Sequence, residues 1–202
     1  MDLYRLKPAS ARLVQPLEDR LVAAGVRPDA ISATAIVLAA AGGACLALSD
    51  RVPWLLLIVP VLAAARLIAN ILDGSVARRT GVARPIGEIW NELGDRVADV
   101  LFIGGLALIP SVEPRLALGA VIAALVASFA GLATRAAGGR RLYVGVMAKP
   151  GRMIVLAVAA PVAFITGDGR FLAGAAALIL VGSLVTLAQR LLAARRELGR
   201  AG

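Results

Sequence analysis

Three long runs without a charged side chain constrain this 202-residue chain more than any other feature. They cover residues 30–49, 116–134 and 171–189. Because a helix rises about 1.5 Å per residue, each run is long enough to cross about 30 Å of hydrocarbon. Hydrophobic residues make up 59% of the chain and charged residues only 17%, against about a quarter charged in soluble domains. The sequence therefore predicts an all-α polytopic membrane protein.

Three shorter charge-free runs cover residues 52–65, 100–112 and 153–167. The first two reach a membrane-spanning length only if charged flanks are included, namely residues 66–72 for one and 87–99 for the other. Together the six runs predict six transmembrane helices in one membrane domain over residues 1–202, with the six-helix core at 29–196.

The juxtamembrane segment, residues 1–28, contains no apolar stretch of signal-peptide length, so we expect no cleavage. Leu13, Leu17 and Leu21 recur at helical spacing, and charged residues lie on the opposite face. This pattern predicts a short amphipathic helix on the membrane surface. Pro16 is expected in its first turn, where proline costs no backbone hydrogen bond.

Basic residues are distributed unevenly between the predicted loops. The amino-terminal segment, the loops after the second and fourth spans and the carboxyl-terminal tail carry most of them, and the opposite loops contain only Arg51, Arg115 and Arg170. The positive-inside rule then places both termini in the cytoplasm, with the protein in the cytoplasmic (inner) membrane. The formal net charge of +9 suggests lipid headgroups or anionic substrates as partners rather than nucleic acid. The absence of His and the single Cys45 exclude His-based chemistry, a disulfide framework and a zinc cluster.

Polar side chains gather where the second and third predicted spans meet the cytoplasm. Asn70 and Asp73 are spaced i, i+3, and Asn91, Asp95 and Asp99 are spaced i, i+4, i+8, so each set shares one helix face. A charge inside the bilayer costs at least about 2.5–3.5 kcal/mol, so these groups need water, a partner charge or a metal. Oxygen ligands of this kind suit Mg²⁺, Mn²⁺ or Ca²⁺. The alternative interpretation is that the acids are solvated at the interface and nearby small residues only allow close helix packing.

The spacing of this cluster resembles the signature of the CDP-alcohol phosphatidyltransferases, D-x2-D-G-x2-A-R-x8-G-x3-D-x3-D. The corresponding residues of this chain are Asn70, Asp73, Gly74, Ala77, Arg78, Gly87, Asn91 and Asp95. Weaker similarity extends to two further segments. Gly25–Asp29 looks like the entry motif of this family, and Lys149–Arg152 looks like a basic element of the same enzymes, notably the phosphatidylinositol-phosphate synthases of actinobacteria.

The resemblance implies a six-span homodimer that transfers the phosphatidyl group of CDP-diacylglycerol to an alcohol acceptor and releases CMP in phospholipid biosynthesis. It implies Asp95 as catalytic base and as a ligand of a divalent cation, Mg or Mn, together with Asp73. The cation would neutralise the diphosphate, and a carboxylate would take the proton of the alcohol. The implied nucleotide-binding residues are Asp73, Gly74, Ala77, Arg78 and Gly87.

Two of the four acid positions of the signature are asparagines in this chain, Asn70 and Asn91. Their amide oxygens remain possible metal ligands, but two negative charges are lost, so we expect one metal ion or weaker binding. Asp99 or Glu92 are possible additional ligands, and Glu88 is a third source of charge. Arg66 lies one turn before Asn70. There it occupies the space of a second metal ion, or it snorkels to the interface or pairs with Asp99.

Basic residues at the cytoplasmic ends of the last three spans indicate a phosphorylated or otherwise anionic acceptor. The candidates are Arg135, Lys149, Arg152 and Arg190. Two other functions stay open at this point. One is a catalytically weak or inactive relative that binds lipid or nucleotide, which the two asparagines favour. The other is a small ion-coupled transporter, since intramembrane acids also suit a cation path.

Overall fold

The computed structural model describes residues 7–82 and 84–199, with side chains from residue 14 onward. This part of the chain contains helices and no strand. The helices are α1 (Lys7–Ala23), α2 (Pro28–Ala47), α3 (Val59–Arg79), α4 (Pro85–Gly104), α5 (Pro114–Ala136), α6 (Lys149–Thr166) and α7 (Arg170–Leu198). Two short 3-10 helices, η2 (Pro53–Leu57) and η3 (Gly105–Leu108), precede α3 and follow α4.

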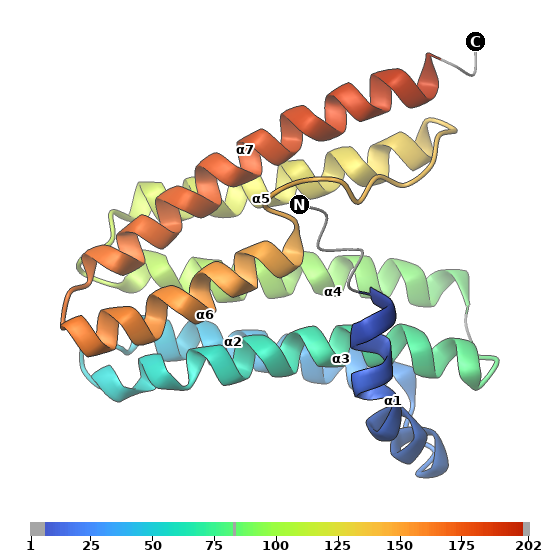
Figure 1. The fold of residues 1–202 in the computed structure, drawn as a ribbon, viewed down its shortest axis with the longest axis horizontal. Coiled ribbons are helices and arrows are strands. Elements are labelled where there is room, and N and C mark those ends of the chain that lie inside the picture. The colour runs from blue at the N-terminus through green and yellow to red at the C-terminus, as the bar shows by residue number, and fades with distance from the viewer. Residues whose placement is uncertain (1–6, 83, 200–202) are drawn as a thin grey trace.

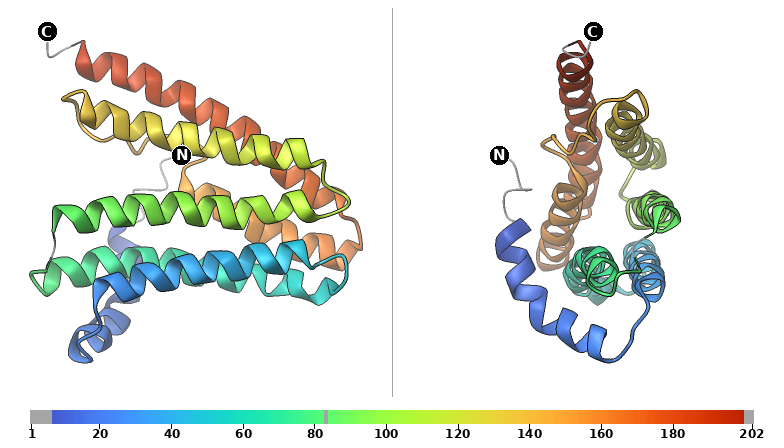
Figure 2. Two further views of the ribbon diagram at one scale, coloured as in Figure 1. Left: turned by 180° about the vertical axis from the view of Figure 1, so that it is seen from behind. Right: turned by 90° about the vertical axis from the view of Figure 1, so that its right-hand side faces the viewer.

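The long helices α2 to α7 lie side by side, and α1 runs crosswise to them near the end of α3 (Figures 1 and 2). Helix α2 packs against both α3 and α4, α6 packs against α3 and α7, and α5 packs against α7. Each helix from α2 to α6 carries a proline at its first or second position. Proline there loses no helical hydrogen bond and has its backbone already in helical geometry, so it fixes where each helix begins.

Five segments are long and apolar enough to cross a membrane: α2, η2 with α3, α5, α6 and α7. The described residues are thus all-helical with five candidate membrane spans, which supports a multi-pass membrane protein; the expected number of six spans is not confirmed. Helix α4 has a sufficient length of 20 residues but is not in this set, because its sequence includes Glu88, Glu92, Asp95, Arg96 and Asp99.

Helix α1 differs in detail from the sequence prediction. It begins at Lys7, so Pro16 lies inside the helix rather than in its first turn. Val14 is buried and Leu21 packs against the same apolar cluster between α2 and α3, whereas Leu17 is 44% exposed. Leu13 belongs to the residues whose side chains the structure does not describe.

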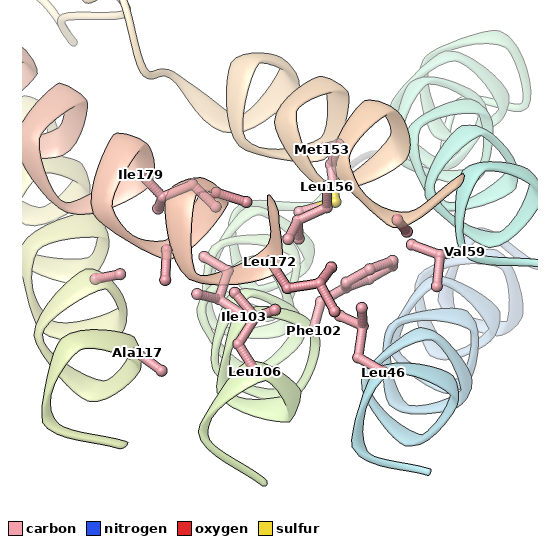
Figure 3. Packing of buried hydrophobic residues seen from close by; sticks show 14 of the residues in the cluster. Leu46, Val59, Phe102, Ile103, Leu106, Ala117, Met153, Leu156, Leu172 and Ile179 are labelled. Atoms are coloured by element: carbon pink, nitrogen blue, oxygen red, sulfur yellow. The ribbon is translucent and has the colours of Figure 1, made fainter. Parts of the chain in front are cut away.

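The apolar core lies toward the end of the bundle where α2 ends and α3 begins, with Leu46 and Val59 among its side chains (Figure 3). Every long helix from α2 to α7 contributes to it. The side chains labelled in Figure 3 are Leu46, Val59, Phe102, Ile103, Leu106, Ala117, Met153, Leu156, Leu172 and Ile179.

Glycines bring the backbones of α2 and α4 into direct contact. A Cβ atom on Gly43 would lie 2.1 Å from the carbonyl oxygen of Leu101, and one on Gly42 would lie 2.4 Å from the Phe102 ring. Neither distance is compatible with a side chain, and the Leu101 oxygen belongs to a helix backbone that cannot easily move. The absence of a side chain at Gly43 therefore allows α4 to pack closely against α2, and this packing fixes the position of α4 in the bundle.

We expect Gly43→Val to destabilise the protein by about 1–3 kcal/mol or more, as overpacking does in well-packed interiors. Thermal unfolding of purified protein in detergent measures the effect. The matched control is Gly174→Ala in α7, where a Cβ would meet no atom within 4 Å. Removing a mid-helix glycine there should leave stability unchanged or raise it by about 0.5–1 kcal/mol. Equal stability of the Gly43 variant and the wild type would contradict the close packing.

Candidate active site

The predicted polar faces of α3 and α4 meet through their side chains, with α2 packed against both helices. Asn70 donates a hydrogen bond from Nδ2 to Asn91 Oδ1 over 3.2 Å and a second to Asp95 Oδ1 over 2.9 Å. The two asparagines therefore join α3 to α4 at the positions where the signature has acids.

Asp73 lies one turn further along α3 and is 4% exposed. Its Oδ2 accepts a hydrogen bond from Ser32 Oγ of α2 over 2.9 Å, and its Oδ1 accepts one from the backbone N–H of Gly74 over 2.6 Å. Both carboxylate oxygens thus have donors, which fix the side chain. Asp73 and Asp95 line the same small cavity, together with Asn70, Asn91 and Lys149.

Lys149, the first residue of α6, forms an ion pair with Asp95. The loop before α6 places it there by folding back onto α7. Within this loop, Met147 N–H donates to Thr186 Oγ1 over 2.8 Å, and the Val144 carbonyl accepts from Arg190 Nε over 2.9 Å. The ammonium group therefore reaches Asp95 from a segment far away in the sequence.

A second, deeper cluster surrounds Asp99, which is fully buried. Its carboxylate pairs with Arg152 over 2.7 Å and with Arg66 over 3.5 Å. The pairing of Arg66 with Asp99 is among the roles expected for Arg66 from the sequence, and the structure shows that pair. Arg66 also donates to the backbone carbonyl of Asp95 over 3.4 Å, so it connects this cluster to the small cavity.

A cavity of about 1220 Å³ adjoins the polar cluster. All residues that align with the signature line it: Asn70, Asp73, Gly74, Ala77, Arg78, Gly87, Asn91 and Asp95. A Cβ on Gly74 would lie 3.1 Å from Arg78 Nη1, so the glycine leaves room for the guanidinium group beside Asp73.

The outer wall of the cavity carries paired charges. Arg135 pairs with Glu88, and Arg141 pairs with Glu92 and stacks 4.7 Å from the centre of the Tyr143 ring. Glu92 also pairs with Arg96 over 2.7 Å. Glu92 is thus held by Arg96 and Arg141, and Arg96 also reaches Asp99 over 3.9 Å.

The four basic residues expected at an acceptor site are placed differently from one another. Arg135 lines the large cavity and Lys149 the small one. Arg152 is 2% exposed and binds Asp99 and the Met147 carbonyl, and Arg190 donates to the carbonyls of Val144 and Ala127. Neither Arg152 nor Arg190 is among the residues lining the two cavities.

Known proteins share this architecture. No family model matches the chain. It is 28% identical, over 155 residues and 77% of either chain, to the inner membrane protein YnbA of Escherichia coli (strain K12). Its structure matches the Mycobacterium tuberculosis phosphatidylinositol phosphate synthase PgsA1 with CDP-DAG bound at a TM-score of 0.75, with 23% identity, over 92% of this chain and 94% of PgsA1. The chain has the fold of this synthase.

The PgsA1 structure in complex with manganese and citrate gives the same TM-score of 0.75, with 21% identity, over 89% of this chain and 87% of PgsA1. PgsA1 is a CDP-alcohol phosphatidyltransferase, so the expected resemblance to that family is confirmed for the fold.

The residues of this chain do not fit a resident pair of divalent cations. In the described ranges, no three His, Cys, Asp or Glu side chains are grouped so that they could hold a metal ion. Asn70 turns the N–H groups of its amide toward Asn91 and Asp95, and a cation requires oxygen atoms there. The ammonium of Lys149 already contacts Asp95.

Sequence reasoning missed two residues of the site. Ser32 holds Asp73, and it lies one turn after the Pro28 that starts α2, but nothing in its sequence context indicates a contact 41 residues away. Arg141 had a weak signal as part of a basic pair beside Tyr143.

Proposed function

We propose that this protein transfers the phosphatidyl group of CDP-diacylglycerol to the hydroxyl of an alcohol and releases CMP. One observation carries the proposal: every position of the signature lines one cavity, although the positions come from two helices. The PgsA1 fold with CDP-DAG bound supports the same donor.

In the proposed reaction the diphosphate of the donor lies against Arg78, whose guanidinium group suits phosphate oxygens. Asp73, Gly74, Ala77 and Gly87 complete the nucleotide site. The acceptor hydroxyl loses its proton to Asp95 as its oxygen attacks the phosphatidyl phosphorus. The new O–P bond replaces the bond to CMP, which leaves with the electron pair.

The expected cofactor, Mg or Mn, has its support in the manganese complex of PgsA1. Its proposed ligands were Asp73, Asp95, Asn70 and Asn91. Because the residues present do not fit a resident pair of such ions, no step proposed above depends on one.

The proposed acceptor is a phosphorylated or otherwise anionic alcohol. The main support for an anionic acceptor is Arg135, which lines the large cavity. Arg141 is a further candidate from the same wall. The buried contacts of Arg152 and Arg190 favour a role in holding the structure rather than in binding the acceptor.

We further propose α4 as the sixth transmembrane helix, within a single membrane domain over residues 1–202. Its charged residues are paired or face the cavity, which lowers the cost of placing them at membrane depth. The name of the YnbA relative supports the inner membrane, and the basic loops support cytoplasmic termini. The proposal that the protein is a homodimer rests only on its resemblance to the CDP-alcohol phosphatidyltransferases.

The test is purified full-length protein with labelled CDP-diacylglycerol and a panel of alcohols, with and without Mg²⁺ or Mn²⁺. Acceptor-dependent CMP release supports the proposal. Nucleotide binding without CMP release under any condition supports the alternative, a catalytically weak or inactive relative that binds lipid or nucleotide. The hydrogen-bonded Asn70 and Asn91 favour this alternative. If activity appears only in Asn70→Asp with Asn91→Asp, the native chain is such a binding protein.

A further inference from the structure

The polar cluster is balanced in charge by the chain itself. Arg96 pairs with Asp99 over 3.9 Å and is itself balanced by Glu92. Besides Arg96 and Glu92, three acids lie along the cluster, Asp73, Asp95 and Asp99, and three basic residues accompany them: Arg66, Lys149 and Arg152. All six side chains are buried or nearly so. A site built for two divalent cations instead needs an excess of acids. Adding two such ions here would leave about four positive charges uncompensated where screening by water is weak.

Lys149 brings a positive charge to Asp95. Its ammonium group contacts Asp95, the acid proposed as base, at the junction of α3, α4 and α6. The same Asp95 oxygen accepts from the Asn70 amide. Lys149 carries one positive charge, which Asp95 alone balances, so no second acid is needed beside it. An uncharged asparagine at position 70 is consistent with this arrangement.

Arg66 offers unused donors to the same place. It is 1% exposed and lines the small cavity beside Asp73 and Asp95. Its Nε and Nη1 atoms are buried without a hydrogen-bond partner in the described part of the chain. Buried donors of this kind are costly unless satisfied, so Arg66 carries positive charge and donor capacity that its contacts with Asp99 and Asp95 do not use up.

We propose that the ammonium of Lys149, with Arg66 beside it, takes the place of resident divalent cations. Both line the small cavity, whose Asp73 and Asp95 also line the large one, so their charge acts on the diphosphate of the donor across this shared wall. The site is then a metal-independent binding site for a nucleoside diphosphate ester. The nucleotide part of this inference rests on the proposed function, and the metal part does not.

The metal part is tested by Mn²⁺ binding to purified protein, followed by electron paramagnetic resonance without any nucleotide. The wild type is expected to bind no Mn²⁺ stoichiometrically. The variant Asn70→Asp/Asn91→Asp/Lys149→Met, which has four acids and no ammonium, is expected to gain binding. Stoichiometric, tight Mn²⁺ binding by the wild type overturns the proposal, whatever the variant does and whether or not the protein is an enzyme.

The nucleotide part is tested by calorimetric titration with CDP in EDTA and in Mg²⁺. Wild-type affinity should be the same in both. Lys149→Met should weaken binding by about tenfold, equivalent to about 1.4 kcal/mol, and Lys149→Arg should retain it. The control Arg140→Gln, which breaks an exposed pair with Glu197 at the same end of the bundle, should change nothing. Binding that is lost in EDTA overturns the inference but leaves the proposed function standing. Absence of CDP binding in both buffers contradicts the proposed function, and the Mn²⁺ result then decides the metal part alone.

Discussion

Asp95→Asn is expected to lower the rate of CMP release by about 10²–10⁴-fold, the usual contribution of a general base. Asp95 lines both cavities and is the carboxylate nearest to the ammonium of Lys149. The asparagine keeps the size of the side chain and its hydrogen bond from Asn70 but cannot accept the acceptor's proton. Initial rates with labelled CDP-diacylglycerol give the effect, which should fall on kcat rather than on the KM for the donor.

The matched control is Asp168→Asn, which removes an acid from an exposed pair with Arg170 in the short connection between α6 and α7. It should leave CMP release unchanged. A thermal unfolding curve of each variant separates loss of chemistry from loss of fold. An Asp95→Asn protein that is folded and as active as the wild type would remove Asp95 from the role of base.

The membrane helices were predictable where the sequence is free of charge. The runs over 30–49, 116–134 and 171–189 coincide with α2, α5 and α7, since twenty apolar residues have few alternatives to a spanning helix. Helix α4 was predicted on weaker grounds, because its charge-free run reaches a spanning length only if the charged flank of residues 87–99 is included. Those charges are covered only in the folded bundle, which the sequence does not show. The course of α1 was predicted least well: its packing against α2 and α3 depends on tertiary contacts that place Val14 inside and Leu17 outside.

The candidate site was predictable as far as helix periodicity extends. Spacing alone places Asn70 with Asp73, and Asn91 with Asp95, on common faces, and these residues line one cavity. The position of Lys149 was not predictable, since it depends on how the loop before α6 folds onto Thr186 and Arg190. The sequence predicts Lys149 as an acceptor-binding residue, which stays a prediction, and the structure adds its contact with Asp95.

Asp99→Asn is expected to destabilise the protein by about 3–5 kcal/mol, the usual cost of breaking a buried ion pair from one side. Asp99 is fully buried and pairs with Arg66 and Arg152, which are 1% and 2% exposed. Without its charge, two arginines remain in the interior, and Arg66 and Arg152 already have nitrogen atoms with no partner among the described residues. Unfolding by heat or by denaturant in detergent measures the loss.

A triple variant separates the cost of unpaired charge from that of lost packing. Asp99→Leu with Arg66→Met and Arg152→Met removes all three charges and keeps comparable side-chain volume, and such replacements are often neutral or stabilising by about 1–4 kcal/mol. We therefore expect the triple variant to be more stable than Asp99→Asn alone. If instead it is less stable than the single variant, the cluster contributes through its hydrogen bonds to Met147 and Asp95 rather than through charge balance. A single variant as stable as the wild type would show that water reaches Asp99, contrary to its burial.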